Sequence, residues 1–163
     1  MERNIFKILN EKNNISIGST MSLGGWKMFL MDKPLEKLLS MTKLNNKTKT
    51  CNYLCQIKEY FGLTYTQIVK RSNFKETYIK DIFSGRRKAS RDAVIGLCFA
   101  FGLNFDESNM LLKSAGHNEL YPRDNRDLLL SKGIIDKLNI REINEILIQY
   151  KVSKIGNFDD DES

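Results

Sequence analysis

The chain has 163 residues, of which 41% are hydrophobic and 28% are charged, and its net charge is +6. These values are typical of one globular domain with appendages and exclude a large multi-domain protein. No apolar run approaches the ~20 residues that cross a bilayer, and the N-terminus lacks the apolar block of a secretion signal. With only three cysteines, no disulfide framework is expected, which favours a cytoplasmic protein.

Positive charge is concentrated in the first two thirds of the chain. Residues 1–50 carry nine Lys and Arg against four acidic residues, and residues 51–103 carry the same numbers. Residues 104–163 carry eight against twelve. Clustered positive charge is favourable beside the phosphates of nucleic acids. Because many basic proteins bind no polyanion, this distribution indicates a function only together with a motif.

Residues 1–47 form an N-terminal segment that is predicted to be partly helical. A short helix is expected over residues 4–12, and a second one from about Pro34. Between them, residues 15–26 alternate apolar and polar side chains before a Gly-Gly pair. That pattern fits either a loop or a short strand.

Helical spacing of apolar residues becomes clear from residue 48 onwards. Five helices are expected, over residues 49–61, 65–71, 75–83, 91–101 and 105–115. In the first of them, the residues expected to face the core are Cys51, Leu54, Cys55, Ile57 and Phe61. In the third, they are Tyr78, Ile79, Ile82 and Phe83. The fourth helix is apolar almost all round and should form the buried centre.

Side-chain caps support these helix boundaries. Thr64 with Gln67, and Asn104 with Glu107, have the spacing of capping boxes, and Ser90 stands at the expected N-cap of the fourth helix. Capping residues at these spacings satisfy backbone N–H groups that a helix start leaves without a partner. The sequence therefore predicts an all-α protein.

An internal repeat links residues 90–115 to residues 125–150, with an offset of 35. The pair Arg91-Asp92 realigns on Arg126-Asp127. Each copy is predicted to be a capped helix, a short turn and an Asn-capped helix. A duplicated hairpin stacked on the core is the interpretation that we favour, and chance similarity between two amphipathic hairpins is the alternative.

The second copy lies within a C-terminal helical hairpin over residues 117–152. Either Asp124 or Asn125 caps its first helix, and Asn139 with Glu142 forms a third capping box. This copy is more polar than the first and should be more exposed. The remaining residues, 153–163, are expected to form an acidic disordered tail.

A recognisable pattern lies between residues 62 and 90. It consists of Gly62-Leu63-Thr64, Ile68, Asn73-Phe74, Ile79, Ile82, Ser84-Gly85, Arg86-Arg87-Lys88 and Ser90. This pattern resembles the phage-repressor-like (Xre-type) helix-turn-helix family of bacterial and phage regulators. The resemblance covers about residues 49–115, and it implies a lambda-repressor-like five-helix DNA-binding domain over residues 48–116.

The resemblance also implies a function, which is transcription regulation by a cytoplasmic, repressor-like protein. The second helix of the motif would enter the major groove of duplex DNA, and two copies would bind paired half-sites as a homodimer. The residues expected to read bases are Lys75, Glu76, Thr77 and Lys80. The residues expected to contact phosphates are Thr64, Tyr65, Thr66, Arg86, Arg87, Lys88 and Arg91. A protein partner could bind the C-terminal hairpin.

Several alternatives stay open at this level. Glu76 and Asp81 place carboxylates in the reading helix, which favours a protein-interaction adaptor on the same scaffold. RNA binding is a third possibility, although no aromatic stacking platform is evident. The cluster Arg86-Arg87-Lys88 also fits a solvated loop. Arg126 and Asp127 are expected to bond each other or the neighbouring loop.

Enzyme and metal chemistry find little support in the sequence. Cys51 and Cys55 share a helix face, but with Cys98 and the single histidine, His117, they make a poor zinc site. His117 follows a glycine and is expected to cap a helix or to be exposed. No triad partner and no phosphate-binding Gly-rich loop are present. We therefore expect no catalytic residue, no metal and no cofactor.

Overall fold

The computed structural model describes residues 3–6, 8 and 50–156. The chain divides into two units, Met1–Lys49 and Thr50–Ser163. In the first unit, residues 5, 6 and 8 are helical, whereas the elements expected over residues 9–47 lie outside the described residues. Within the described ranges all regular structure is helical, which confirms the predicted all-α class. No helix in these ranges is long and apolar enough to cross a membrane.

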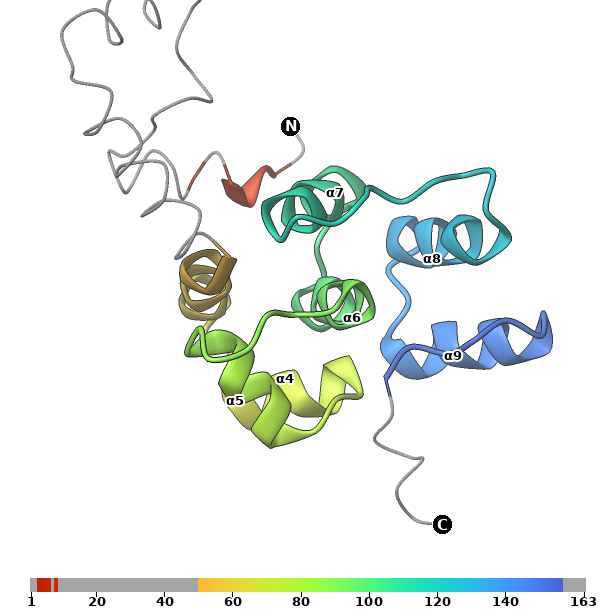
Figure 1. Ribbon diagram of the computed structural model, residues 1–163. Helices are drawn as coiled ribbons and strands as arrows, with labels where there is room; N and C mark the ends of the chain where they lie inside the picture. The colour runs from red at the N-terminus through yellow and green to blue at the C-terminus, as the bar shows by residue number, and fades with distance from the viewer. Residues whose placement is uncertain (1–2, 7, 9–49, 157–163) are drawn as a thin grey trace, which may run out of the picture. The chain divides into compact units, whose positions relative to one another are not determined.

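Seven helices follow one another over residues 50–156, the described part of the second unit (Figure 1). They are a helix over residues 50–61, α4 (Tyr65–Ser72), α5 (Glu76–Phe83), α6 (Arg91–Phe101), α7 (Phe105–Ser114), α8 (Asn125–Ile135) and α9 (Ile140–Gln149). The first five begin and end within one residue of the predicted bounds. Local signals explain this agreement, because helix ends depend on caps and on the period of apolar residues.

The predicted caps are present. Thr64–Gln67, Asn104–Glu107 and Asn139–Glu142 all form complete capping boxes. Ser90 caps α6, and of the two candidates for α8 it is Asp124 that caps the helix. Asn73 ends α4 in the left-handed conformation, with φ 63°, as its place in the expected turn requires.

Helix α6 forms the centre of the fold, with α4, α5, α7 and α9 around it in Figure 1. Every residue from Ala93 to Phe101 is buried. Close approach of α6 to the turn between α4 and α5 depends on Gly96. A Cβ at that position would lie 2.9 Å from both the Phe74 ring and the Ser72 carbonyl oxygen.

Replacing Gly96 by alanine should therefore destabilise the protein. Alanine gains about 1 kcal/mol in helix propensity, but overpacking against a fixed ring and backbone costs about 1–3 kcal/mol. We expect a net loss of up to about 2 kcal/mol in urea unfolding. The matched control is Gly133→Ala, whose Cβ would lie 2.7 Å from the movable Cδ1 of Ile143. A Gly96→Ala protein more stable than the control would contradict this account of the packing.

The helix over residues 50–61 corrects one sequence prediction. Leu54 and Ile57 are fully buried as expected, but Cys55 is exposed. Its thiol donates a 3.4 Å hydrogen bond to the carbonyl oxygen of Phe83, at the end of α5. Cys55 directly follows Leu54 in the sequence and therefore lies at the edge of the apolar face of the helix. At such an edge, helical spacing alone does not determine whether a side chain is buried.

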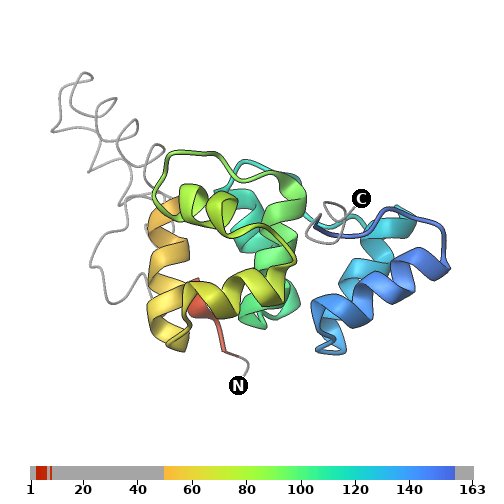
Figure 2. The same cartoon turned by 90° about the horizontal axis from the view of Figure 1, so that it is seen from below.

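Figure 2 shows the two hairpins of the predicted repeat, α6–α7 and α8–α9, side by side, and α6 contacts α9 while α7 contacts α8. Equivalent arginines hold the segment that follows each hairpin. Arg91 donates from Nε and Nη2 to the carbonyl oxygens of residues 118 and 119. Arg126 donates from its own Nε and Nη2 to the carbonyl oxygens of residues 153 and 154. These acceptors lie 35 residues after those of Arg91, which is the offset of the repeat. The repeat therefore extends beyond the hairpins themselves.

Equivalent asparagines hold the next residue in each copy. Asn109 Oδ1 accepts from the N–H of Leu120 at 2.9 Å, and Asn144 Oδ1 accepts from the N–H of Ile155 at 2.7 Å. Both apolar side chains are buried. The second copy is the more exposed, since α8 buries five residues where α6 buries nine.

In the repeated Arg-Asp pairs, the arginine of each copy bonds the aspartate of the other copy. Arg91 forms a bidentate pair with Asp127, at 3.0 and 2.8 Å, and Arg126 forms one with Asp92, at 2.8 and 3.0 Å. Of the two expected alternatives, Arg126 and Asp127 bond neighbouring loop segments and not each other: Arg126 donates to the carbonyl oxygens of residues 153 and 154, and Asp127 accepts from the Tyr121 N–H. Each copy thus supplies a cation and an anion to the other, which fixes the two hairpins against each other.

The expected tail was also placed too early. Residues 153–156, assigned to the disordered tail, are described by the structure, and Ile155 is fully buried. The hydrogen bonds from Asn144 and Arg126 account for this order, because they satisfy the backbone of the segment. Only residues 157–163 of the expected tail lie outside the described residues.

Candidate nucleic-acid interface

Helix α5 presents a polar face to solvent. The predicted base-reading residues are all exposed: Lys75, Glu76, Thr77 and Lys80. On the opposite side, Ile79, Ile82 and Phe83 are buried. Helix α4 and the turn at Asn73 brace this buried side, because α4 packs against both α5 and α6. The α5 face is therefore both rigidly supported and accessible.

Charges on this face partly neutralise one another. Lys80 Nζ lies 2.6 Å from Glu76 Oε1, one helical turn away, and both side chains are more than half exposed, at 52% and 57%. An exposed pair of this kind is worth less than about 1 kcal/mol. The pair can therefore open at little cost when a polar ligand approaches either residue.

Tyr65, at the start of α4, lies between two cations. Its ring packs edge-to-face on Phe83, with centroids 5.6 Å apart. Lys58 Nζ lies 4.6 Å from the Tyr65 ring centroid, and Lys80 Nζ lies 5.9 Å from it. Tyr65 thus connects the predicted phosphate-binding start of α4 to the α5 face. The sequence analysis did not identify Lys58 as a site residue, because nothing in the spacing of residues indicates that the helix over residues 50–61 lies beside α4.

The start of α4 keeps part of its predicted anion-binding capacity. The Thr64 hydroxyl accepts from the N–H of Gln67, so one of the first-turn N–H groups is already used by the capping box. Thr64 and Thr66 are exposed. The remaining N–H groups of the first turn point out of the helix, where a phosphate oxygen can accept from them.

The cationic loop Arg86-Arg87-Lys88 is exposed, and Tyr78 contacts its middle residue and Ser90, which lies just beyond it. The Arg87 guanidinium lies 5.0 Å from the centre of the Tyr78 ring. The Tyr78 hydroxyl donates to Ser90 Oγ at 3.3 Å and accepts from the Ser90 N–H at 3.1 Å. Tyr78, expected in the core, is only half-buried, and it ties the reading helix to this loop.

The end of the same loop is fixed by His117. Its Nε2 lies 2.8 Å from the carbonyl oxygen of Ala89. Because a carbonyl oxygen only accepts, Nε2 carries the proton in this bond. His117 thus joins the segment after α7 to the loop, a role that the expectation of capping or simple exposure did not include.

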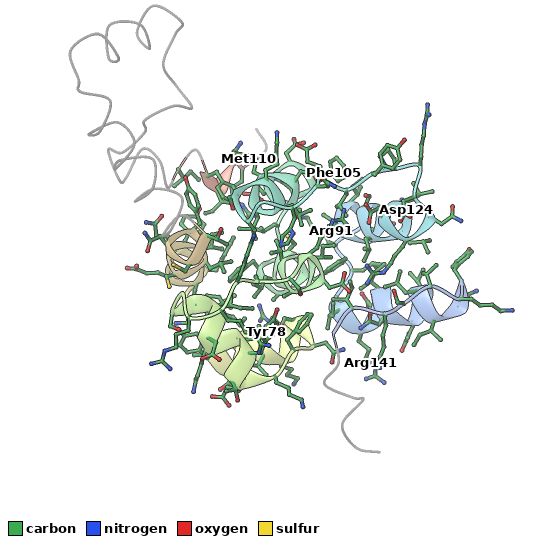
Figure 3. All side chains as sticks on the ribbon, viewed as in Figure 1. Tyr78, Arg91, Phe105, Met110, Asp124 and Arg141 are labelled. Carbon is green, nitrogen blue, oxygen red and sulfur yellow. The ribbon has the colours of Figure 1, made fainter. Side chains whose placement is uncertain are left out.

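Arg91 differs from the other predicted phosphate-binding residues. Its guanidinium donates to both Asp127 carboxylate oxygens and to two backbone carbonyls. The hydrogen bond to Asp127 raises the pKa of Arg91 in spite of partial burial. Its donors are committed within the fold, and Figure 3 labels Arg91 beside α6 and α8. The structure therefore separates Arg91 from the exposed group Arg86, Arg87 and Lys88.

Thiol chemistry and metal binding gain no support from the described part of the chain. No group of three His, Cys, Asp or Glu side chains there could hold a metal ion. Burial raises the pKa of Cys98 to about 12. Although Cys55 is exposed as a residue, the surrounding protein partly desolvates its thiol, and this desolvation, followed by the neighbouring Cys51, raises the pKa of Cys55. Raised pKa values disfavour the reactive thiolate.

A mainly apolar cleft of about 280 Å³ lies elsewhere, between the end of α6 and the turn that joins α8 to α9. Arg71 and Lys137 are its charged lining residues, and it includes none of the predicted site residues. The α5 face and the loop after it remain the best-defined candidate site. Comparison of this chain with family models, curated proteins and solved structures finds no match.

Proposed function

We propose that this protein is a sequence-specific duplex DNA-binding transcription regulator with a lambda-repressor-like helix-turn-helix domain. The observation that carries the proposal is the exposed polar face of α5, braced by α4 and tied through Tyr78 to a loop of three exposed cations. A helix supported in this way fits the width of a major groove. No metal and no cofactor enter the proposal.

The proposed role of each group of residues, phosphate binding or base reading, follows from its chemistry. The Arg86, Arg87 and Lys88 cations, with the N–H groups at the start of α4, would bind phosphates and supply affinity. Lys75 and Lys80 would donate to guanine acceptors, Thr77 would contact either donors or acceptors, and Glu76 would accept from a cytosine amine. Glu76 becomes available for this role when its exposed pair with Lys80 opens.

Two copies bound to paired half-sites would be the active form, since one eight-residue reading helix contacts only a few base pairs. The site of action would be the cytoplasm, where the free cysteines Cys51, Cys55 and Cys98 stay reduced. The acidic residues Glu76 and Asp81 favour a second candidate, a protein-interaction adaptor that uses the same face of α5.

Substitution of Lys80 or Thr77 by alanine tests base reading. Because both side chains are exposed, neither change should affect folding. We expect each to weaken binding to the preferred duplex by about 5- to 100-fold, with less than about twofold loss on random duplex. Fluorescence anisotropy on both duplexes measures the difference. Equal losses on the two would remove these residues from base reading.

A further inference from the structure

The apolar cleft at the end of α6 is built from side chains of the core. Its volume is about 280 Å³, and its walls come from residues 98–103 and from residues 134 and 137–140. Four of its large apolar residues, Phe99, Phe101, Ile134 and Ile140, are each at most 8% exposed. Because close packing fixes such side chains, the cleft keeps its shape without a ligand. Its apolar surface favours an apolar ligand over water.

Among the described residues, two cations and no carboxylate line this cleft. Arg71 comes from the last turn of α4, and Lys137 comes from the turn between α8 and α9. The Arg71 guanidinium makes no hydrogen bond and no ion pair with the part of the chain that the structure describes. Lys137 Nζ makes one long hydrogen bond, of 3.4 Å, to the carbonyl oxygen of Gly102. Both cations can therefore bind an anion without losing a strong partner.

The acidic residues that lie close to Lys137 in the sequence have other partners. Asp136 Oδ1 lies 2.8 Å from Lys132 Nζ, one turn earlier in α8. Glu142 Oε2 accepts from the Asn139 N–H at 2.9 Å, within the capping box of α9. Neither carboxylate lines the cleft. The cleft thus combines apolar walls with positive charge, which is complementary to an amphipathic anion.

We propose that this cleft binds a small organic acid, with an apolar body of about eight carbons and one carboxylate. A cavity of about 150 Å³ accepts benzene, so the larger volume here suffices for about ten non-hydrogen atoms. The apolar body lies against the core side chains, and Arg71 and Lys137 bind the carboxylate, which matches the planar guanidinium. No lining residue belongs to α5, so the proposal does not depend on DNA binding.

Octanoate is a probe of this size, and octan-1-ol is its uncharged counterpart. In ¹H–¹⁵N spectra of the full chain, octanoate should shift the amide resonances of residues 98–103 and 134–140, with a Kd of about 0.1–1 mM. Octan-1-ol should bind about five- to tenfold more weakly, because its hydroxyl carries no charge for the two cations. No shifts of these resonances at millimolar octanoate would overturn the proposal. Equal affinities for the two probes would also overturn it, since the cations would then play no part.

A matched pair of variants tests the two cations directly. The first is Arg71→Gln with Lys137→Gln, and the control is Lys70→Gln with Lys151→Gln, at exposed positions outside the lining. Both variants lower the net charge by two, and Lys151 shares with Lys137 a left-handed backbone, with φ 59° for each. We expect the first variant to bind octanoate about tenfold more weakly than the wild type, and the control to differ by less than about twofold. Wild-type affinity in the first variant, or equal losses in both, would overturn the site.

Discussion

Replacement of Arg86, Arg87 and Lys88 together by alanine is expected to weaken binding to any duplex DNA by on the order of a hundredfold at ~0.1 M salt. Each phosphate contact contributes about 0.9 to the slope of log K against log salt concentration. The loss of three contacts should therefore reduce the magnitude of the slope by about 2.7. The loop is exposed, so the effect is on binding and not on folding.

Anisotropy titrations at four or more salt concentrations measure this slope. A control with Lys132→Ala and Arg141→Ala removes exposed cations from the C-terminal hairpin, where Arg141 projects into solvent (Figure 3). That control should change affinity by less than about twofold, because screening limits distant charges. If the triple variant keeps the wild-type salt slope, the loop is not part of the DNA interface.

Asp127→Ala is expected to produce the largest loss of stability, about 2–3 kcal/mol in urea unfolding. The Asp127 side chain is only 9% exposed, and it accepts from Arg91 and from the Tyr121 N–H, at 2.9 Å for the latter. Its removal leaves both donors without this partner. The equivalent change in the other copy, Asp92→Ala, removes a side chain that is 42% exposed, and it should cost less than about 1 kcal/mol.

The difference between these variants should depend on pH. Burial alone would raise the pKa of Asp127, but the hydrogen bonds from Arg91 and the Tyr121 amide outweigh it and lower the pKa below its ordinary value. The unfolded chain has the ordinary pKa of about 3.9. The stabilisation is therefore complete above that pH and is lost as the pH falls through the lower pKa of the folded state. Equal stability losses at pH 7 and pH 2 would contradict this assignment.

The helices could be predicted because their signals are local. Capping boxes such as Thr64–Gln67 and Asn139–Glu142 join residues three apart, and they appear in the structure as expected. The left-handed turn at Asn73 is local for the same reason. The extension of the repeat beyond the hairpins could also have been predicted from the sequence. Leu120 and Ile155 are both apolar and are separated by the same offset as the rest of the repeat.

The tertiary partners could not be predicted in this way. Arg126 has Asp127 as its neighbour in sequence, but it pairs with Asp92 across the hairpins, and only the packing of α6 against α8–α9 decides that choice. The role of Tyr78 in holding the Arg87 loop depends on a turn whose path the sequence does not define. Functional assignments at such positions need the folded geometry.

Selection from a pool of random duplex DNA tests the central claim most directly. The recovered sequences should share a palindrome that binds at least about a thousandfold more tightly than random duplex, with half-sites about 34 Å apart or a multiple of that distance. The spacing would then define the dimer. No enrichment, together with only weak and salt-sensitive binding, would contradict sequence-specific regulation and favour the protein-interaction adaptor.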